Sequence, residues 1–228
     1  MDKPEPFVRE AGTGPGVVCL HANASSSSQW RGLMEQLSPA FHVLAVDSYD
    51  SGKSPQWRSD QVITLDDEVA LIQPVLERAG TPLALVGHSY GAAVAFIAAL
   101  ADPNRIRAIA VYEPTLFGLV DARVAPAQRR RRDPACGRRG RRGARCRRPS
   151  RGRRAVHRLL DGRRSRGADS TRTSATDRST AAAHAVSRLL VSALPRVKVV
   201  TMDELGHMGP VTHPDQVNPV IQHFLERI

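Results

Sequence analysis

The sequence predicts an α/β domain in which helices cover both faces of a mostly parallel β-sheet. Three observations support this prediction. The chain has 228 residues, which is enough for one such domain and short for two. Short apolar runs typical of buried strands alternate with stretches that have the apolar period of a helix. Strands that are separated by helices pair in parallel through right-handed crossovers.

The first 120 residues contain most of the expected elements. Strands are predicted at 17–20, 42–46, 83–86 and 106–112. Helices are predicted at 29–38, 64–79 and 92–101. Thr64 is the expected N-cap of the second helix, with Asp67 three residues later, so this helix has a defined start.

The C-terminal part resumes the alternation. A helix is predicted at 181–194, a strand at Val197–Met202 and a final helix at Pro214–Ile228. The last helix has an apolar stripe of helical spacing, formed by Val217, Val220, Ile221, Phe224 and Leu225. We therefore expect this part to complete the domain begun by the first 120 residues.

The charge of the chain is concentrated in one block. The net charge is +11, but residues 129–166 alone carry 18 arginines and two acidic residues, which makes the block +16 and the rest of the chain −5. The block has no apolar period and no aromatic residue, so it offers neither a buried face nor rings that stack on bases. We therefore do not expect nucleic acid as a partner.

Other residues give little sign of metal, cofactor or membrane binding. Cys19 lies in an apolar run, while Cys136 and Cys146 lack the spacing of a zinc site. No apolar run is long enough to span a bilayer, and the N-terminus does not have the pattern of a signal peptide. The expectation is a cytoplasmic protein without cofactor or metal.

The motif that carries chemistry is Gly87-His88-Ser89-Tyr90-Gly91. It follows an apolar strand and precedes an alanine-rich helix. A serine in such a turn is raised at the carboxyl end of its strand, close to the N-terminus of the helix, and the flanking glycines allow strand and helix to approach closely. The motif therefore predicts that Ser89 is a nucleophile.

With this motif in this setting, the chain resembles the α/β-hydrolase superfamily. Within this superfamily it is most similar to small serine esterases, enol-lactonases and related capped hydrolases. The resemblance covers residues 6–120 and about 179–228. It implies an α/β-hydrolase fold with the N-terminal part of the core at 1–120, the C-terminal part at 179–228, and an irregular Arg-rich segment, degenerate or disordered, at 121–178 in place of the cap.

The resemblance also assigns roles to residues outside the turn. His21-Ala22-Asn23 is similar to the family's oxyanion loop, with Ala22 in place of the usual glycine. By that match, the backbone N–H groups of Asn23 and Tyr90 would hold the oxyanion, and His21 would fix the loop. His207 stands where the family carries its catalytic histidine, before the final helix.

The acid that would orient His207 has two candidates. Most relatives place it after the strand that precedes the histidine-bearing strand, which corresponds to the neighbourhood of Asp177. Some place it after the strand that follows the nucleophile, which corresponds to Glu113. Glu113 lies in intact sequence and is favoured, and Asp177 is retained as the alternative.

The Arg-rich segment has three interpretations. GC-rich genes read in a wrong frame give runs of Arg, Gly, Ala and Pro, so two compensating frameshifts, near 122–128 and 175–180, are the favoured explanation. A functional basic arm that binds phosphate and a solvated linker are the alternatives. The nucleotide sequence across 120–180 distinguishes them.

The expected activity is hydrolysis of a small carboxylic ester through an acyl-enzyme. A serine nucleophile, in place of aspartate, argues against epoxide hydrolase or dehalogenase chemistry. C–C bond hydrolases and cofactor-free haloperoxidases use the same residues. The alternative from another class is an inactive α/β-hydrolase remnant, because the abnormal segment replaces the region in which relatives hold the cap and one strand of the sheet.

Overall fold

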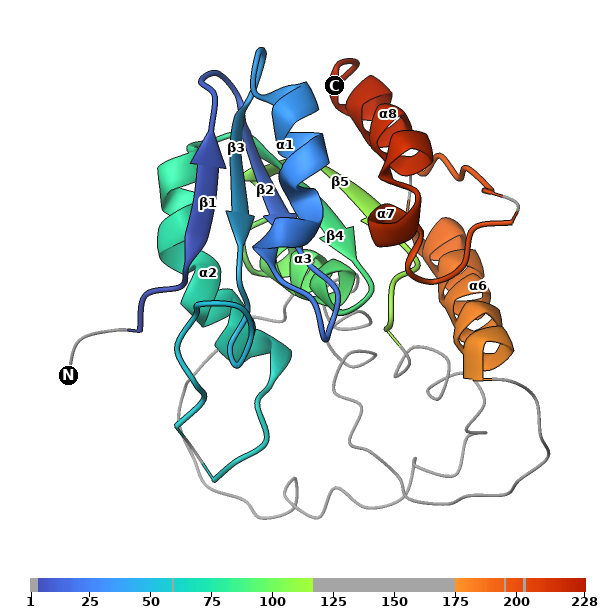
Figure 1. The fold of residues 1–228 in the computed structure, drawn as a ribbon, viewed down its shortest axis with the longest axis horizontal. Helices are drawn as coiled ribbons and strands as arrows, with labels where there is room; N and C mark the ends of the chain where they lie inside the picture. Colours follow the sequence, from blue (N-terminus) through green and yellow to red (C-terminus); the bar gives the residue numbers. More distant parts are fainter. Residues whose placement is uncertain (1–3, 59, 117–174, 195, 203) are drawn as a thin grey trace, which may run out of the picture.

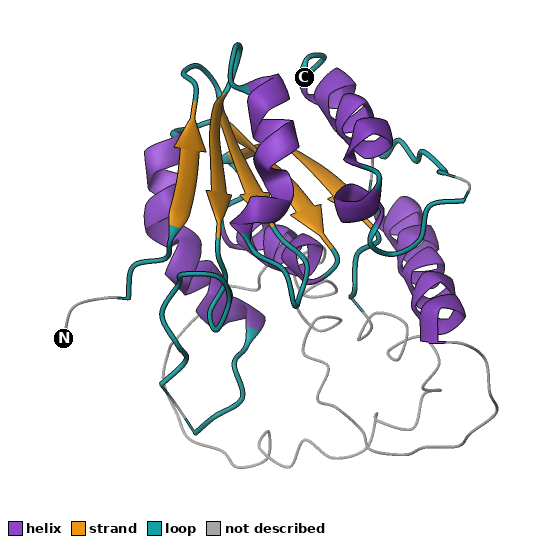
Figure 2. Ribbon diagram, in the orientation of Figure 1, coloured by secondary structure: helices purple, strands orange, loops and turns teal. Residues whose placement is uncertain are grey.

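The computed structural model describes residues 4–58, 60–116, 175–194, 196–202 and 204–228. Five strands form one sheet with helices on both faces (Figures 1 and 2). The strands are β1 (Val8–Ala11), β2 (Gly16–Leu20), β3 (His42–Val46), β4 (Leu83–His88) and β5 (Ile106–Tyr112). The helices are η1 (Ser27–Trp30), α1 (Arg31–Leu37), α2 (Leu65–Ala79), α3 (Tyr90–Ala101), α6 (Ala175–Ala193), α7 (Gly209–Thr212) and α8 (Pro214–Leu225).

The strand order in the sheet is β1-β3-β2-β4-β5. β2, β3, β4 and β5 are parallel to one another, and β1 pairs antiparallel with β3. The prediction of a mostly parallel sheet is therefore confirmed. Parallel pairing also brings the carboxyl ends of β2, β4 and β5 to one edge of the sheet, because Leu20 pairs with Gly87, and His88 pairs with Tyr112.

The hydrophobic core has two parts, one on each face of the sheet, and the side chains of β2 alternate between them. Val18 and Leu20 belong to a buried cluster shared with α2 and α3, and Val17 and Cys19 belong to a second cluster shared with α1 and α8. Successive side chains of a strand point to opposite faces, so a strand that is apolar at every position fits only between two layers of helices. All five residues of β2 are buried, as this arrangement requires.

α2 starts where its sequence predicts. Thr64 is the N-cap, its side chain accepts from the Asp67 N–H, and the Asp67 side chain accepts from the Thr64 N–H in return. This reciprocal capping box satisfies two donors that a helix start leaves unpaired. The helix ends at Ala79, before Gly80, whose φ of 88° suits glycine.

The prediction of a strand at Val197–Met202 is wrong. The segment has no strand pairing, and Val197, Val199 and Val200 are 43%, 59% and 49% exposed. Within the described residues the sheet ends at β5, and this segment does not join it. The valines of this segment favour an extended backbone, but a strand forms only when the backbone also pairs with another strand.

β1 was not predicted. It is a four-residue edge strand, VREA, without an apolar run, and it forms because its backbone pairs with that of β3. α6 begins at Ala175, upstream of the expected helix at 181–194, and the expected helix at Pro214–Ile228 is α8, which ends at Leu225.

The Arg-rich block at 129–166 lies outside the described residues, and so does most of the segment predicted to stand in place of a cap. None of the helices in the described ranges is both long and apolar enough to cross a membrane.

Candidate active site

Ser89 occupies a sharp turn between β4 and α3. Its φ and ψ of 53° and −110° lie outside the regions that L-residues favour, and it is 5% exposed. A Cβ on Gly87 would lie 2.6 Å from the Ala92 Cα, and one on Gly91 would overlap the Leu20 and His21 carbonyl oxygens. The turn therefore needs glycine two residues before and two residues after Ser89, as the motif predicts.

Backbone hydrogen bonds hold the turn from both sides. The Ser89 N–H donates to the Tyr112 carbonyl at the end of β5 (3.0 Å), and the Gly91 N–H donates to the His21 carbonyl after β2 (3.1 Å). The Ser89 carbonyl accepts from the Thr115 N–H (3.3 Å). Ser89 is thereby fixed relative to the two strands that flank β4.

His207 lies between Ser89 and Glu113. Its Nε2 is 2.8 Å from the Ser89 Oγ, and its Nδ1 is 2.6 Å from the Glu113 Oε2. A carboxylate only accepts hydrogen bonds, so Nδ1–H donates to Glu113 and Nε2 is left to accept the Ser89 hydroxyl proton. The His207 and Glu113 side chains are 23% and 13% exposed.

Glu113, the favoured candidate acid, contacts His207. It follows β5 directly, and β5 pairs with β4, so Glu113 and Ser89 come from adjacent strand ends. Glu113 has a φ of 42°, a left-handed backbone that a non-glycine residue rarely adopts. Asp177 lies in α6, in a stretch whose side chains are outside the described part of the structure.

The loop expected to stabilise an oxyanion lies against the turn. His21 is 1% exposed; its Nδ1–H donates to the Ala22 carbonyl (2.7 Å), and its Nε2 accepts from the Ser48 N–H (3.0 Å). Burial lowers the pKa of His21, which favours this neutral form. His21 thus fixes the loop to the segment after β3, as predicted. Tyr90 is the first residue of α3, where an N–H has no acceptor within its helix.

Comparison with known proteins identifies the family. Residues 15–133, just over half of the chain, match the family model described as alpha/beta hydrolase fold. The chain belongs to the α/β-hydrolase family.

Curated relatives of this chain differ in the activities that their names give. It is 31% identical over 118 residues to a haloalkane dehalogenase of Agrobacterium fabrum, covering 51% of this chain and 38% of the relative. It is 31% identical over 106 residues to lipase LipV of Mycobacterium tuberculosis, covering 46% and 39%. It is 34% identical over 112 residues to 2-(acetamidomethylene)succinate hydrolase of Mesorhizobium japonicum, covering 48% and 39%. The matched part therefore spans about two-fifths of the length of these relatives.

Solved structures give matches of similar extent. The structure titled E-2-(acetamidomethylene)succinate hydrolase is 31% identical, with a TM-score of 0.42, and covers 46% of this chain and 38% of that one. An α/β-hydrolase from Sphaerobacter thermophilus is 27% identical, with a TM-score of 0.43, and covers 48% and 41%.

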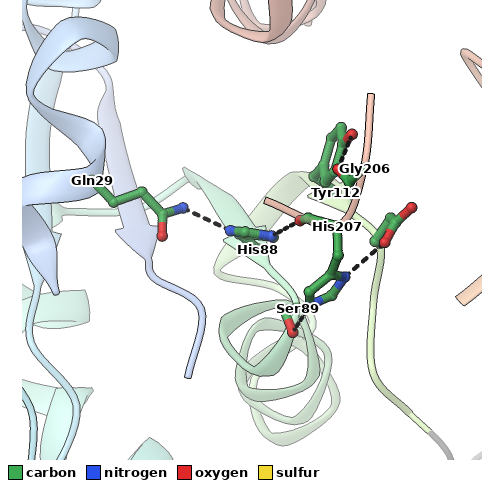
Figure 3. A network of polar contacts seen from close by, with 7 residues as sticks. Gln29, His88, Ser89, Tyr112, Gly206 and His207 are labelled. Carbon is green, nitrogen blue, oxygen red and sulfur yellow. Dashed lines mark hydrogen bonds and ion pairs between the residues drawn. The ribbon is translucent and has the colours of Figure 1, made fainter. Parts of the chain in front are cut away.

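Three polar side chains that sequence reasoning missed form a network around His207 (Figure 3). His88 Nε2 is 2.6 Å from the His207 carbonyl oxygen, and His88 Nδ1 is 3.0 Å from Gln29 Nε2. The Gln29 Oε1 accepts from the Ala22 N–H (3.3 Å), and the Tyr112 hydroxyl donates to the Gly206 carbonyl (3.0 Å). The variable second position of the motif was the one available signal, because it places His88 next to Ser89.

A buried carboxyl group lies behind the turn. Glu68 of α2 is 2% exposed, its Oε1 is 3.4 Å from the Tyr90 hydroxyl, and its Oε2 accepts from the Tyr49 N–H (3.3 Å). Burial raises the pKa of Glu68 to about 7, against the opposing effect of these hydrogen bonds, and burial followed by the charge of Glu68 raises the pKa of Tyr90. Among the described residues, no three His, Cys, Asp or Glu side chains are grouped as metal ligands would be.

Proposed function

We propose that this α/β-hydrolase is a serine hydrolase that cleaves a small carboxylic ester through an acyl-enzyme. The observation that carries the proposal is the continuous chain from Glu113 through His207 to Ser89, with contacts of 2.6 and 2.8 Å. An acid, an imidazole and a hydroxyl in this order make the hydroxyl a nucleophile at neutral pH.

The steps follow from the hydrogen bonds. The Ser89 Oγ attacks the ester carbonyl carbon while its proton passes to the His207 Nε2, and Glu113 stabilises the imidazolium that forms. The carbonyl oxygen becomes an oxyanion, which the Asn23 and Tyr90 N–H groups stabilise. The tetrahedral intermediate collapses, and the alcohol leaves with the proton from His207.

Water completes the cycle. It attacks the acyl-enzyme carbonyl, gives its proton to the His207 Nε2 and forms a second tetrahedral intermediate. When this collapses, the Ser89 Oγ takes the proton back and the carboxylic acid leaves. No group other than Ser89, His207, Glu113 and the two backbone donors is needed.

The identity of the nucleophile favours an acyl substrate over the carbon–halogen bond named for one relative. If a serine hydroxyl displaced a halide from carbon, the product would be an ether, which water does not hydrolyse. If it attacked a carbonyl carbon, the product would be an ester, which water hydrolyses at the same carbonyl. Turnover by Ser89 therefore requires a carbonyl group in the substrate.

The test is hydrolysis of p-nitrophenyl acetate by the full chain, with Ser89→Ala as the variant and Ser192→Ala, an exposed serine of α6, as the matched control. We expect Ser89→Ala to lower kcat by up to about 10⁶-fold, to the background rate, and Ser192→Ala to leave it unchanged. A fluorophosphonate should label Ser89 in the wild type and nothing in Ser89→Ala.

The alternative is an inactive α/β-hydrolase remnant, for which the unpaired segment at Val197–Met202 is the specific observation. It predicts a cooperative thermal transition without turnover of the ester above the Ser89→Ala rate and without fluorophosphonate labelling. That combination would contradict the esterase proposal.

A further inference from the structure

We infer that His88 and Tyr112 are positioning residues that hold the backbone of Gly206–His207 and so place the His207 imidazole against Ser89. The inference rests on the proposed function for the role of His207 in catalysis. The polar atoms of both side chains bind backbone carbonyls of this loop, and the His88 ring also lies against the His207 ring, with centroids 5.3 Å apart.

The loop that carries His207 has little support from the sheet. The segment before it, Val197–Met202, is unpaired, and three of its valines are largely exposed. A Cβ on Gly206 would have no atom within 4 Å, so the chain is loosely surrounded just before His207. On the other side, the Gly209 N–H donates to the Gly206 carbonyl (2.8 Å) as α7 begins. On the N-terminal side, Met202 and Leu205 pack against the core, but no strand pairing fixes the backbone there.

His88 supplies one contact that holds this backbone. Its Nε2 faces the His207 carbonyl, which only accepts, so this nitrogen must carry the proton and the Nδ1 must accept from the Gln29 amide. The Gln29 orientation is set in turn, because its oxygen accepts from the Ala22 N–H. His88 has no exposed surface, and burial lowers its pKa to about 4, so the ring stays neutral at the pH at which esters are assayed.

Tyr112 supplies the second contact, to the preceding carbonyl. Its hydroxyl donates to the Gly206 carbonyl (3.0 Å), and its ring lies edge-on to the His88 ring, with centroids 5.6 Å apart. The two rings thus bind consecutive carbonyl groups of one loop. With the peptide groups on both sides of the His207 Cα fixed, the direction of its side chain is fixed as well.

The residues follow a pattern along the two strand ends. At the end of β4, His88 binds the loop backbone and the next residue, Ser89, contacts the imidazole. At the end of β5, Tyr112 binds the loop backbone and the next residue, Glu113, contacts the imidazole. Each strand end therefore contributes one residue that fixes the backbone of the loop and one that meets its side chain. Loss of either backbone contact should move Nε2 away from the Ser89 Oγ.

The experiment compares His88→Phe, His88→Gln, Tyr112→Phe and the double variant His88→Phe/Tyr112→Phe in the full chain. The control is Leu37→Ala, which removes a buried side chain of α1 from the core. A displaced catalytic group costs about 100-fold in rate, so His88→Phe should lower kcat for p-nitrophenyl acetate by about 100-fold with little change in KM.

The other variants separate positioning from a general loss of structure. His88→Gln keeps an N–H donor and an acceptor, so it should recover most of the rate lost in His88→Phe. Tyr112→Phe keeps its ring and loses one hydrogen bond, so its effect should be smaller. The double variant should lose more than the product of the two single effects, because each contact partly compensates for the other. Leu37→Ala should lose stability while its folded fraction keeps the wild-type kcat.

Equal rates for His88→Phe and His88→Gln, or a wild-type kcat in His88→Phe, would overturn the inference.

A second measurement does not depend on turnover. The proton between His207 Nδ1 and Glu113 should give a low-field resonance in the NMR spectrum of the wild type, assigned by its loss in Glu113→Gln. We expect it to broaden or shift in His88→Phe and Tyr112→Phe and to be unchanged in Leu37→Ala. Failure of the esterase proposal would appear as equal rates in the wild type and Ser89→Ala, with this resonance still responding to His88. A wild-type spectrum without the resonance, or one indifferent to both variants, would contradict the inference.

Discussion

The two halves of the candidate site are held in different ways. The half that carries Ser89 follows an interior strand of the sheet: all six residues of β4 are buried, and β4 is paired on both sides. The half that carries His207 follows a segment without strand pairing, with exposed valines. In the first half, backbone hydrogen bonds of the sheet set the geometry. In the second half, side chains from the ends of β4 and β5 bind the loop. The geometry of the Ser89 half therefore depends on the pairing of strands, whereas the geometry of the His207 half depends on a few side-chain hydrogen bonds.

The largest expected effect tests the contact that joins the two halves. Glu113→Gln replaces an acceptor with an amide that can donate to His207, which favours the wrong tautomer and removes the charge that stabilises the imidazolium. We expect kcat for p-nitrophenyl acetate to fall by about 10⁴-fold at unchanged fold. Glu35→Gln, an exposed residue of α1, is the control. A fall of less than tenfold would argue that Glu113 is not the acid of the site.

The next effect compares the two halves by their glycines. Gly91→Ala would force a Cβ against the carbonyl oxygens of Leu20 and His21, whereas Gly206→Ala would meet no atom within 4 Å. We expect Gly91→Ala to lower the free energy of unfolding by about 3 kcal/mol or more and Gly206→Ala to change it by less than about 0.5 kcal/mol, as measured by urea denaturation. Similar values for the two variants would contradict the division into a tightly packed half and a loosely packed half.

The third prediction uses the carboxyl group behind the Ser89 half. The pKa of Glu68 is raised from 4.5 to about 7 in the folded state, so the folded state binds this proton more tightly than the unfolded state does. The stability that comes with the protonated form is complete below pH 4.5 and is lost as the pH rises through about 7. Glu68→Gln mimics the protonated form and should therefore exceed the wild type by about 2 kcal/mol at pH 8.5 and by little at pH 5.

Urea denaturation at the two pH values measures this difference, with Glu77→Gln, an exposed glutamate of the same helix, as the control. An equal difference between Glu68→Gln and the wild type at pH 5 and pH 8.5 would show that ionisation of Glu68 has no part in it.

The smallest expected effect concerns the segment before His207. Val199 is 59% exposed, and Val199→Ala should change the free energy of unfolding by less than about 0.5 kcal/mol. The matched substitution in the other half, Val86→Ala, removes fully buried methyl groups from β4 and should lower it by about 2 kcal/mol. A large loss in Val199→Ala would indicate that the segment is packed in solution, and the comparison between the halves would then fail.

Prediction from the sequence succeeded where local pattern and tertiary structure agree. The sequence predicted the strands β2 and β4 from their apolar runs and the start of α2 from its N-cap, Thr64. Prediction failed where a strand forms only if another strand pairs with it. The four residues of β1 form a strand because β3 pairs with them, and Val197–Met202 forms none because it does not join the described sheet.

The site divides in the same way. Ser89 and His207 carry signals in the sequence, a turn between two glycines and a place before the last helix. Glu113 is favoured over Asp177 because it lies in intact sequence. Gln29 and Tyr112 carried no such signal, and the signal for His88 was its place next to Ser89. Each of the three acts through a hydrogen bond to a group distant in the chain, as His88 does with the His207 carbonyl.

The sequence by itself determined the α/β class, the strands that are buried on both faces, and the turn that carries Ser89, because apolar period, capping and the need for glycine are properties of short segments. Only the tertiary structure decided which strands pair, which carboxylate meets His207, and which side chains hold its loop. These depend on contacts between residues up to 119 positions apart, such as His88 and His207, whose approach is set by the packing of β4 and β5 with the segment before α8.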